Sequence, residues 1–174
     1  MSDGKRIQQL IYDWLDRNYP DGPTWYGRSA TESPSLEIKM IPAFDRIEYN
    51  LSNGGWAQFL WNCFGYWRDV INIARDGYLL IGASEQSVAL TTLRTLCERD
   101  ERECGENHER AMVEFEKKGS DAWSAIFGEF TSRSYSAPSN DWEPLFYGDD
   151  VYEKRLAWLA ANEARVRKAI GMLD

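Results

Sequence analysis

Residues 45–62 read DRIEYNLSNGGWAQFLWN, and this stretch carries more structural information than any other part of the chain. Gly54 and Gly55 can adopt a positive φ without a Cβ clash, and Asn53 tolerates the same backbone region. The apolar residues from Trp56 to Phe64 lie at helical spacing and on more than one face. The pattern predicts a polar-faced helix, a tight turn, and a second helix that is buried on nearly every side.

The turn at residues 53–55 has two interpretations. In the first, it only directs the chain into the core, and Asn53 caps the following helix by accepting a backbone N–H. In the second, the amides of Asn53 and Gln58 and the carboxylate of Glu48 lie beside the turn and recognise a ligand. The residues alone leave both interpretations open.

The same stretch resembles a motif of the bacterial DNA-mimic protein family, which is also classed as a domain of unknown function. The matching positions are an acidic residue, an Asn-Gly-Gly-aromatic turn and two later amides: Glu48, Asn53, Gly54, Gly55, Trp56, Gln58 and Asn62. Ile81-Gly82-Ala83 resembles a second family element, and the resemblance covers mainly residues 43–98. It implies an inhibitor that binds a DNA-binding protein and blocks its nucleic-acid surface, and it also implies a homodimer.

The composition is that of an acidic, folded protein. The 174 residues include 28 Asp and Glu against 20 Lys and Arg, which gives a net charge of −8. A hydrophobic content of 43% with eight Trp residues supplies a sizeable core. The negative charge disfavours direct binding to nucleic acid or to an anionic membrane, and it permits binding to a basic protein surface. No run of about 18 apolar residues is present, so we expect no membrane-spanning helix.

The sequence predicts no cofactor, no metal site and no enzyme. Cys63, Cys97 and Cys104 are widely spaced without a CxxC pair, so we expect reduced thiols in the cytoplasm rather than a zinc site. The single His108 lies in a charged run and is expected at the surface. No Walker loop, GxSxG elbow or HExxH motif occurs, although a hydrolase that uses carboxylates alone remains an alternative.

Helical periodicity recurs along the chain, and no segment shows the alternation of a β-strand. We expect a single all-α domain over residues 1–174, with about seven or eight helices and no significant sheet. The first helix is amphipathic and does not resemble a signal peptide. A second begins near Ser35, with a break expected at Pro42. A long helix from about residue 151 to residue 173 closes the chain.

Two acidic segments are candidates for binding a basic partner. In residues 98–110, Glu and Arg recur at i, i+4 spacing, so paired side chains on a solvated helix explain the charges. Residues 141–153 contain five acids without Lys or Arg, and aromatic residues lie between them. We predict the second segment as the partner-binding surface, through Asp141, Glu143, Asp149, Asp150 and Glu153. Stabilisation of a helix N-terminus is the alternative role for Asp149 and Asp150.

Two further patterns also have two interpretations. In the last helix, apolar residues from Tyr152 to Leu173 alternate by four and three and are interrupted at Glu163, as in a heptad seam. This helix packs on its own domain or forms a self-association surface. The tryptophans belong to the core or line a ligand pocket: Trp25, Trp56, Trp61, Trp67, Trp123 and Trp142.

These observations support three functional hypotheses. The first is an acidic protein-binding module, a DNA-mimic-like inhibitor of a DNA-binding protein. A ten-base-pair face of duplex DNA holds roughly twenty charges, so one copy of this chain is a poor mimic and a dimer is a closer one. The second is an immunity protein or antitoxin that neutralises a cognate toxin, such as a basic nuclease. The third is a small-molecule binder or enzyme that uses the Asn-Gly-Gly turn, and burial of that turn would count against it.

Overall fold

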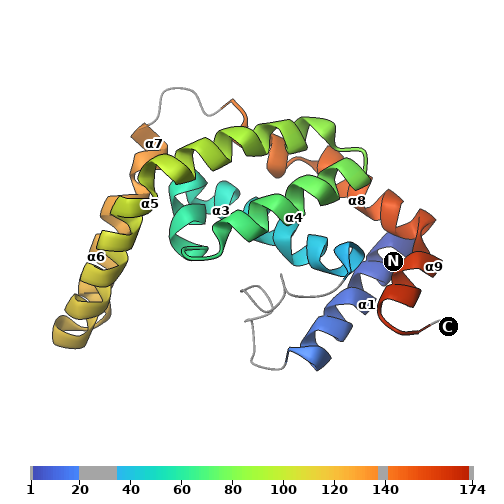
Figure 1. Cartoon of the computed structure of the whole chain (residues 1–174), viewed down its shortest axis with the longest axis horizontal. Coiled ribbons are helices and arrows are strands. Elements are labelled where there is room, and N and C mark those ends of the chain that lie inside the picture. Colours follow the sequence, from blue (N-terminus) through green and yellow to red (C-terminus); the bar gives the residue numbers. More distant parts are fainter. Residues whose placement is uncertain (1, 20–34, 137–140, 173–174) are drawn as a thin grey trace.

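Residues 2–19, 35–136 and 141–172 are described by the structure, a computed structural model, and within these ranges the chain is helical without a strand (Figure 1). The prediction of an all-α fold is therefore confirmed. The elements are α1 (Asp3–Asn18), α3 (Leu36–Asn62), α4 (Trp67–Leu80), α5 (Ser84–Lys118), α6 (Ser120–Thr131), α7 (Arg133–Ser136), the 3₁₀ helix η2 (Glu143–Phe146), α8 (Asp149–Ala161) and α9 (Glu163–Ala169).

Helix α3 is the centre of the fold. It packs against α4, α5 and η2, while α1 lies against α8 near the two ends of the chain (Figure 1). Helical spacing explains which residues face inward, because Ile7, Ile11 and Leu15 form one stripe of α1 and are all fully buried. The buried apolar side chains of the helices join into one hydrophobic cluster.

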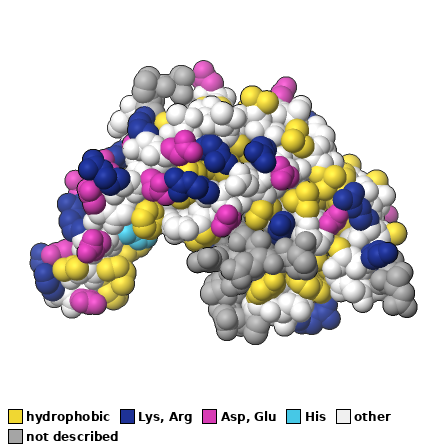
Figure 2. All heavy atoms as spheres, viewed as in Figure 1, with side chains coloured by type: hydrophobic (Ala, Val, Ile, Leu, Met, Phe, Trp, Pro, Cys, Tyr) yellow, Lys and Arg dark blue, Asp and Glu magenta, His cyan; other side chains and the backbone are white. Residues whose placement is uncertain are grey.

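Helix α5 extends beyond the body of the molecule, and its second half pairs with α6 to form an arm (Figure 1). Gly119 ends α5 with a φ of 80°, which allows the chain to reverse into α6. Ala111 and Phe130 are buried in this arm, whereas Met112 and Phe115 remain exposed. Figure 2 shows acidic and basic side chains interspersed over the arm, as the predicted mixed-charge helix requires.

Two helix boundaries differ from the predictions. Pro42 lies seven residues into α3 and does not break it, because its ring removes only the one hydrogen bond to the Ile38 carbonyl while the flanking residues are buried in the core. The final helix is not continuous, since Asn162 leaves helical geometry with φ −118° and ψ 26° between α8 and α9. The Asn162 side chain donates to the Trp158 carbonyl at 2.9 Å and so satisfies an acceptor at the end of α8.

The predictions about membrane-spanning helices and about the cysteines can be compared with the described helices. None of them combines the length and the apolar character needed to cross a membrane. Cys63, Cys97 and Cys104 are all free and buried. Burial raises the pKa of each thiol, to about 12 for Cys63 and Cys104. These cysteines are therefore core residues with unreactive thiols.

Candidate functional site

The Asn-Gly-Gly turn lies within α3 as a kink at Gly55. Gly55 has φ 73° and ψ −168°, a backbone conformation that only glycine adopts readily. A Cβ on Gly55 would lie 2.5 Å from the Ser134 Cβ and 3.1 Å from Glu143 Oε1. Backbone conformation and close packing therefore both require glycine here. Gly54, Gly55 and Trp56 are all buried, so the turn offers no open cleft to a ligand.

Two distant side chains cap the helical segment that follows the kink. The backbone N–H of Trp56 donates to Glu143 Oε1, and that of Ala57 donates to the Ser134 hydroxyl, both at 2.9 Å. The kink leaves these N–H groups without partners in their own helix, and the positive end of the segment favours a carboxylate. The prediction that Asn53 caps this segment is wrong. Asn53 belongs to the helix before the kink, where its side chain donates a hydrogen bond to the Tyr49 carbonyl at 2.7 Å.

The amides of the motif join the two halves of α3. Asn50 is fully buried, and its Oδ1 accepts hydrogen bonds from Asn62 Nδ2 at 2.7 Å and from Gln58 Nε2 at 3.4 Å. Its own amide donates to the Arg46 carbonyl at 2.6 Å. The amides thus bond to each other across the kink, which supports the structural interpretation of the motif over ligand recognition at the turn.

Glu48, the acidic residue of the motif, belongs to a buried ion cluster. The Arg155 side chain is only 4% exposed and donates to Asp45 Oδ1 and to Glu48 Oε2, both at 3.0 Å. The hydroxyl of Tyr12 donates to Asp45 at 2.8 Å, and that of Tyr78 donates to Glu48 at 3.3 Å. One guanidinium group is therefore shared by two carboxylates, and the cluster ties α1, α3, α4 and α8 together.

The ion cluster holds more negative than positive charge. Burial raises the pKa of Glu48 to about 7, with the charge of Arg155 opposing this shift and that of Asp45 adding to it. Burial also raises the pKa of Asp45. Sequence reasoning missed Arg155 because its partners Asp45 and Glu48 lie 110 and 107 residues earlier, and no local pattern marks such a pair.

Four of the five predicted partner-binding acids lie on the surface around the start of α8. Asp141, Asp149, Asp150 and Glu153 are exposed, and Asp150 pairs with Lys154 at 2.7 Å. Glu143 does not share this surface. It is only 6% exposed, because its carboxylate faces inward to cap the segment after Gly55, and burial raises its pKa. Tyr147, which is 49% exposed, lines the same pocket as Asp149.

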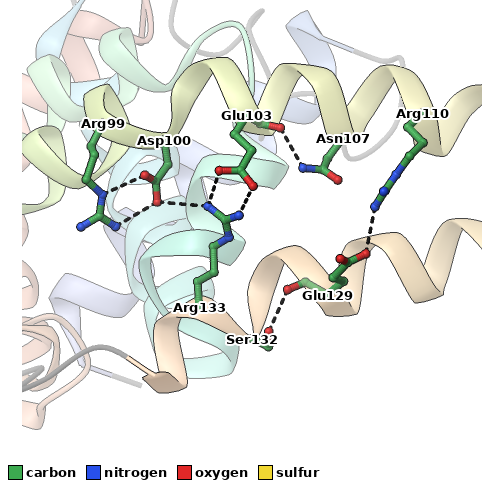
Figure 3. Close-up of polar contacts among 8 residues, drawn as sticks. All are labelled: Arg99, Asp100, Glu103, Asn107, Arg110, Glu129, Ser132 and Arg133. Carbon is green, nitrogen blue, oxygen red and sulfur yellow. Dashed lines mark hydrogen bonds and ion pairs between the residues drawn. The ribbon is translucent and has the colours of Figure 1, made fainter.

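The charged segment at residues 98–110 lies in α5, and ion pairs to α6 and α7 occupy much of its charge (Figure 3). Arg133 reaches Glu103 and also Asp100, the latter at 3.6 Å. Arg110 pairs with Glu129 at 2.9 Å. A pocket of about 370 Å³ between these helices is lined by both signs of charge. The ion pairs of this segment therefore fasten the arm and neutralise part of its negative charge.

The tryptophans among the described residues lie in the core or pack against it, and His108 stacks on two aromatic rings. His108 is partly buried rather than free at the surface, and its ring stacks on Trp61 and Phe64 at centroid distances of 4.2 and 5.0 Å. Trp56, Trp61 and Trp67 are buried, whereas Trp25 lies outside the described residues. The described residues hold no group of three or more His, Cys, Asp or Glu side chains that could bind a metal ion.

The fold and these contacts define an acidic, all-α protein whose Asn-Gly-Gly turn is a structural element of α3 and whose exposed acids include Asp149 and Glu153 of α8. A family model described as DMP19-like protein matches residues 34–162, and the chain belongs to this family. The match confirms the predicted resemblance and extends it from the start of α3 to the end of α8. No curated protein and no solved structure gives a significant match.

Proposed function

We propose that this protein is a protein-binding module of the DNA-mimic type, which binds a basic, DNA-binding partner and blocks its nucleic-acid surface. The family match over residues 34–162 carries this proposal, because it includes both the internal motif and the acidic surface. The net charge of −8 supports the same proposal, because it attracts a basic partner and repels nucleic acid.

The surface that we propose for partner binding is centred on Asp149. Asp141, Asp149 and Glu153 are exposed and form no ion pair within the described residues, so their charges are available to a partner. Asp150 contributes less, because Lys154 already pairs with it. Exposed Tyr147 adds an aromatic contact of the kind enriched in protein interfaces.

A homodimer is the binding form that we propose. Duplex DNA carries about one charge per 1.7 Å of its axis, so the net −8 of one chain is well below the roughly twenty charges of a ten-base-pair face. Two chains with their acidic surfaces aligned come closer to that number. Light scattering coupled to size-exclusion chromatography tests the dimer directly, and a monomer mass at working concentration would reject it.

Burial of Gly54 and Gly55 counts against a small-molecule or enzyme function at the Asn-Gly-Gly turn, of which only Asn53 is exposed. An immunity protein or antitoxin is compatible with the same acidic surface, and only the identity of the partner separates it from an inhibitor of another DNA-binding protein. A captured nuclease toxin would favour the immunity function, whereas a captured sequence-specific DNA-binding protein would favour the mimic function.

The experiment is a pull-down from the native cell lysate with the protein as bait, followed by a challenge with excess duplex DNA at constant salt. Release of the captured partner by DNA supports a shared nucleic-acid surface, and a partner that DNA does not release rejects mimicry. The test variant is Asp141→Asn/Asp149→Asn/Glu153→Gln. The control variant, Asp16→Asn/Glu109→Gln/Glu116→Gln, loses the same charge at other exposed positions. We expect the first variant to lose the partner and the second to retain it.

A further inference from the structure

A pocket of about 300 Å³ lies where the middle of α3 meets the start of α8. Its lining combines two carboxylates with four aromatic side chains, of which Tyr49 and Tyr147 are exposed: Glu48, Asp149, Tyr49, Tyr147, Tyr152 and Phe146. Among the described residues that line it, none is Lys or Arg. The volume is at the lower end of the range of small-ligand pockets, which suits a single side chain better than a drug-sized molecule.

The charge at this pocket is negative because its carboxylates outnumber the cation beside them. Glu48 shares Arg155 with Asp45, so these three groups carry one negative charge in excess when both carboxylates are ionised. Asp149 forms no ion pair within the part of the chain that the structure describes. A cation placed between Glu48 and Asp149 would therefore be attracted from both sides, at a site partly shielded from water.

The aromatic rings at this pocket also suit a cation. The Tyr152 ring already faces two cations of the chain, with Arg155 Cζ at 5.0 Å and Lys5 Nζ at 5.8 Å from its centroid. Tyr49 and Tyr147 are 60% and 49% exposed, and no cation of the described residues lies over either ring. A planar guanidinium can stack on such a ring and donate hydrogen bonds to a neighbouring carboxylate at the same time.

We propose that this pocket binds the guanidinium group of an arginine side chain of the protein partner and so anchors the partner on the acidic surface. The affinity of the pocket for a guanidinium group is argued from its lining residues alone. The assignment of that group to an arginine of the partner rests on the proposed function. Arginine fits better than lysine because its planar, forked donors match a carboxylate beside an aromatic face. The pocket would thus fix the register of a basic segment that the surrounding acids attract only diffusely.

The test is an NMR titration of the isotope-labelled protein with Nα-acetyl-arginine methylamide. We expect weak, saturable binding with shift changes confined to residues around Tyr49, Tyr147 and Asp149. The neutral isostere Nα-acetyl-citrulline methylamide should bind detectably more weakly. Tyr147→Ala and Asp149→Asn should each weaken arginine binding by roughly two- to fivefold, since each removes one exposed cation contact. Asp16→Asn, a surface acid of α1, should leave it unchanged.

Nα-acetyl-lysine methylamide is titrated as a third probe. Three outcomes would overturn the proposed arginine pocket: citrulline binding as tightly as arginine, shift changes spread over other surfaces, or the lysine derivative binding more tightly than the arginine derivative. Preserved spectral dispersion shows that each variant remains folded. A separate pull-down with Asp149→Asn distinguishes the two proposals. If the free arginine derivative binds the pocket but no DNA-releasable partner is found, the pocket stands and the proposed function fails. If such a partner is captured equally by Asp149→Asn and by the unchanged protein, the anchoring role of the pocket fails.

Discussion

Replacing Gly55 by alanine should destabilise the protein strongly, because this glycine meets two independent requirements. Its φ of 73° and ψ of −168° belong to a region that other residues avoid. An added Cβ would also lie 2.5 Å from the Ser134 Cβ and 2.7 Å from its Oγ. Ser134 would have to move away and would then no longer accept the hydrogen bond from the backbone N–H of Ala57.

The magnitude follows from these two parts. Holding a residue with a side chain in this backbone region costs about 1–3 kcal/mol. Leaving the buried N–H of Ala57 unpaired costs about another 1–3 kcal/mol. Gly55→Ala should therefore lower the free energy of unfolding by about 2–6 kcal/mol, which is a large part of the roughly 5–15 kcal/mol of a typical domain. The pair Gly55 and Ser134 is thus a sensitive probe of the kink.

The measurement is urea unfolding of Gly55→Ala beside a control variant, Gly65→Ala. Gly65 also has a positive φ, 87°, but an added Cβ there meets no heavy atom within 4 Å. The control variant should lose only the free energy needed to hold a non-glycine residue at positive φ, about 1–2 kcal/mol. The difference between the two variants therefore measures the lost packing and capping at the kink. Equal shifts of the unfolding midpoint, at unchanged slope, would refute the close approach of Gly55 to Ser134.

Three further predictions, one on the Ser134 cap and two on the ion cluster of Arg155, Asp45 and Glu48, are tested by urea unfolding. Ser134→Ala leaves the Ala57 N–H unpaired and should cost about 1–3 kcal/mol; no loss would mean that the hydroxyl is not a cap. Folding raises the pKa of Glu48 from 4.5 to about 7, so the folded state binds the extra proton, and stability should fall by up to about 3 kcal/mol as pH rises from 4.5 to 7. The pKa of Asp45 shifts the same way, and Glu48→Gln should flatten the profile, whereas an unchanged profile would contradict this assignment. Arg155→Leu removes the cation from two buried carboxylates and should cost about 3–5 kcal/mol at pH 8 and less at pH 5, where protonation relieves them; a loss independent of pH would contradict the ion cluster.

The helices could be predicted from the sequence because their spacing is a local property. The stripe of Ile7, Ile11 and Leu15 in α1 is fully buried, as its 4-residue steps require. The turn at Gly54 and Gly55 was also predictable, since two adjacent glycines before a largely apolar helical segment favour a change of chain direction there. Pro42 shows the limit of this reasoning: a local helix-breaking tendency was outweighed by burial of α3 on both sides of it.

The contacts that complete the kink could not be predicted, because they join distant segments. Glu143 and Ser134 reach α3 from 87 and 77 residues away along the chain. In the sequence, Glu143 is one acid among several in an aromatic-rich segment, and nothing local separates it from exposed Asp141. Charge can be read from the sequence, but burial depends on which helix end the carboxylate meets. Four of the five predicted acids are therefore exposed and Glu143 is buried, while their role in partner binding stays a prediction.

The residues of the family motif therefore make their contacts within the molecule. Its glycines shape the kink, its amides bond across α3 through Asn50, and Glu48 is held by Arg155. A sequence can keep all of these contacts while its surface changes, because none of them depends on the exposed acids around Asp149. These motif residues thus fix the fold, and a change of the surface at α8 would leave their contacts intact. Under the proposed function, the substitutions that test partner binding therefore lie at surface residues such as Asp149 and Tyr147, outside the Asn-Gly-Gly turn.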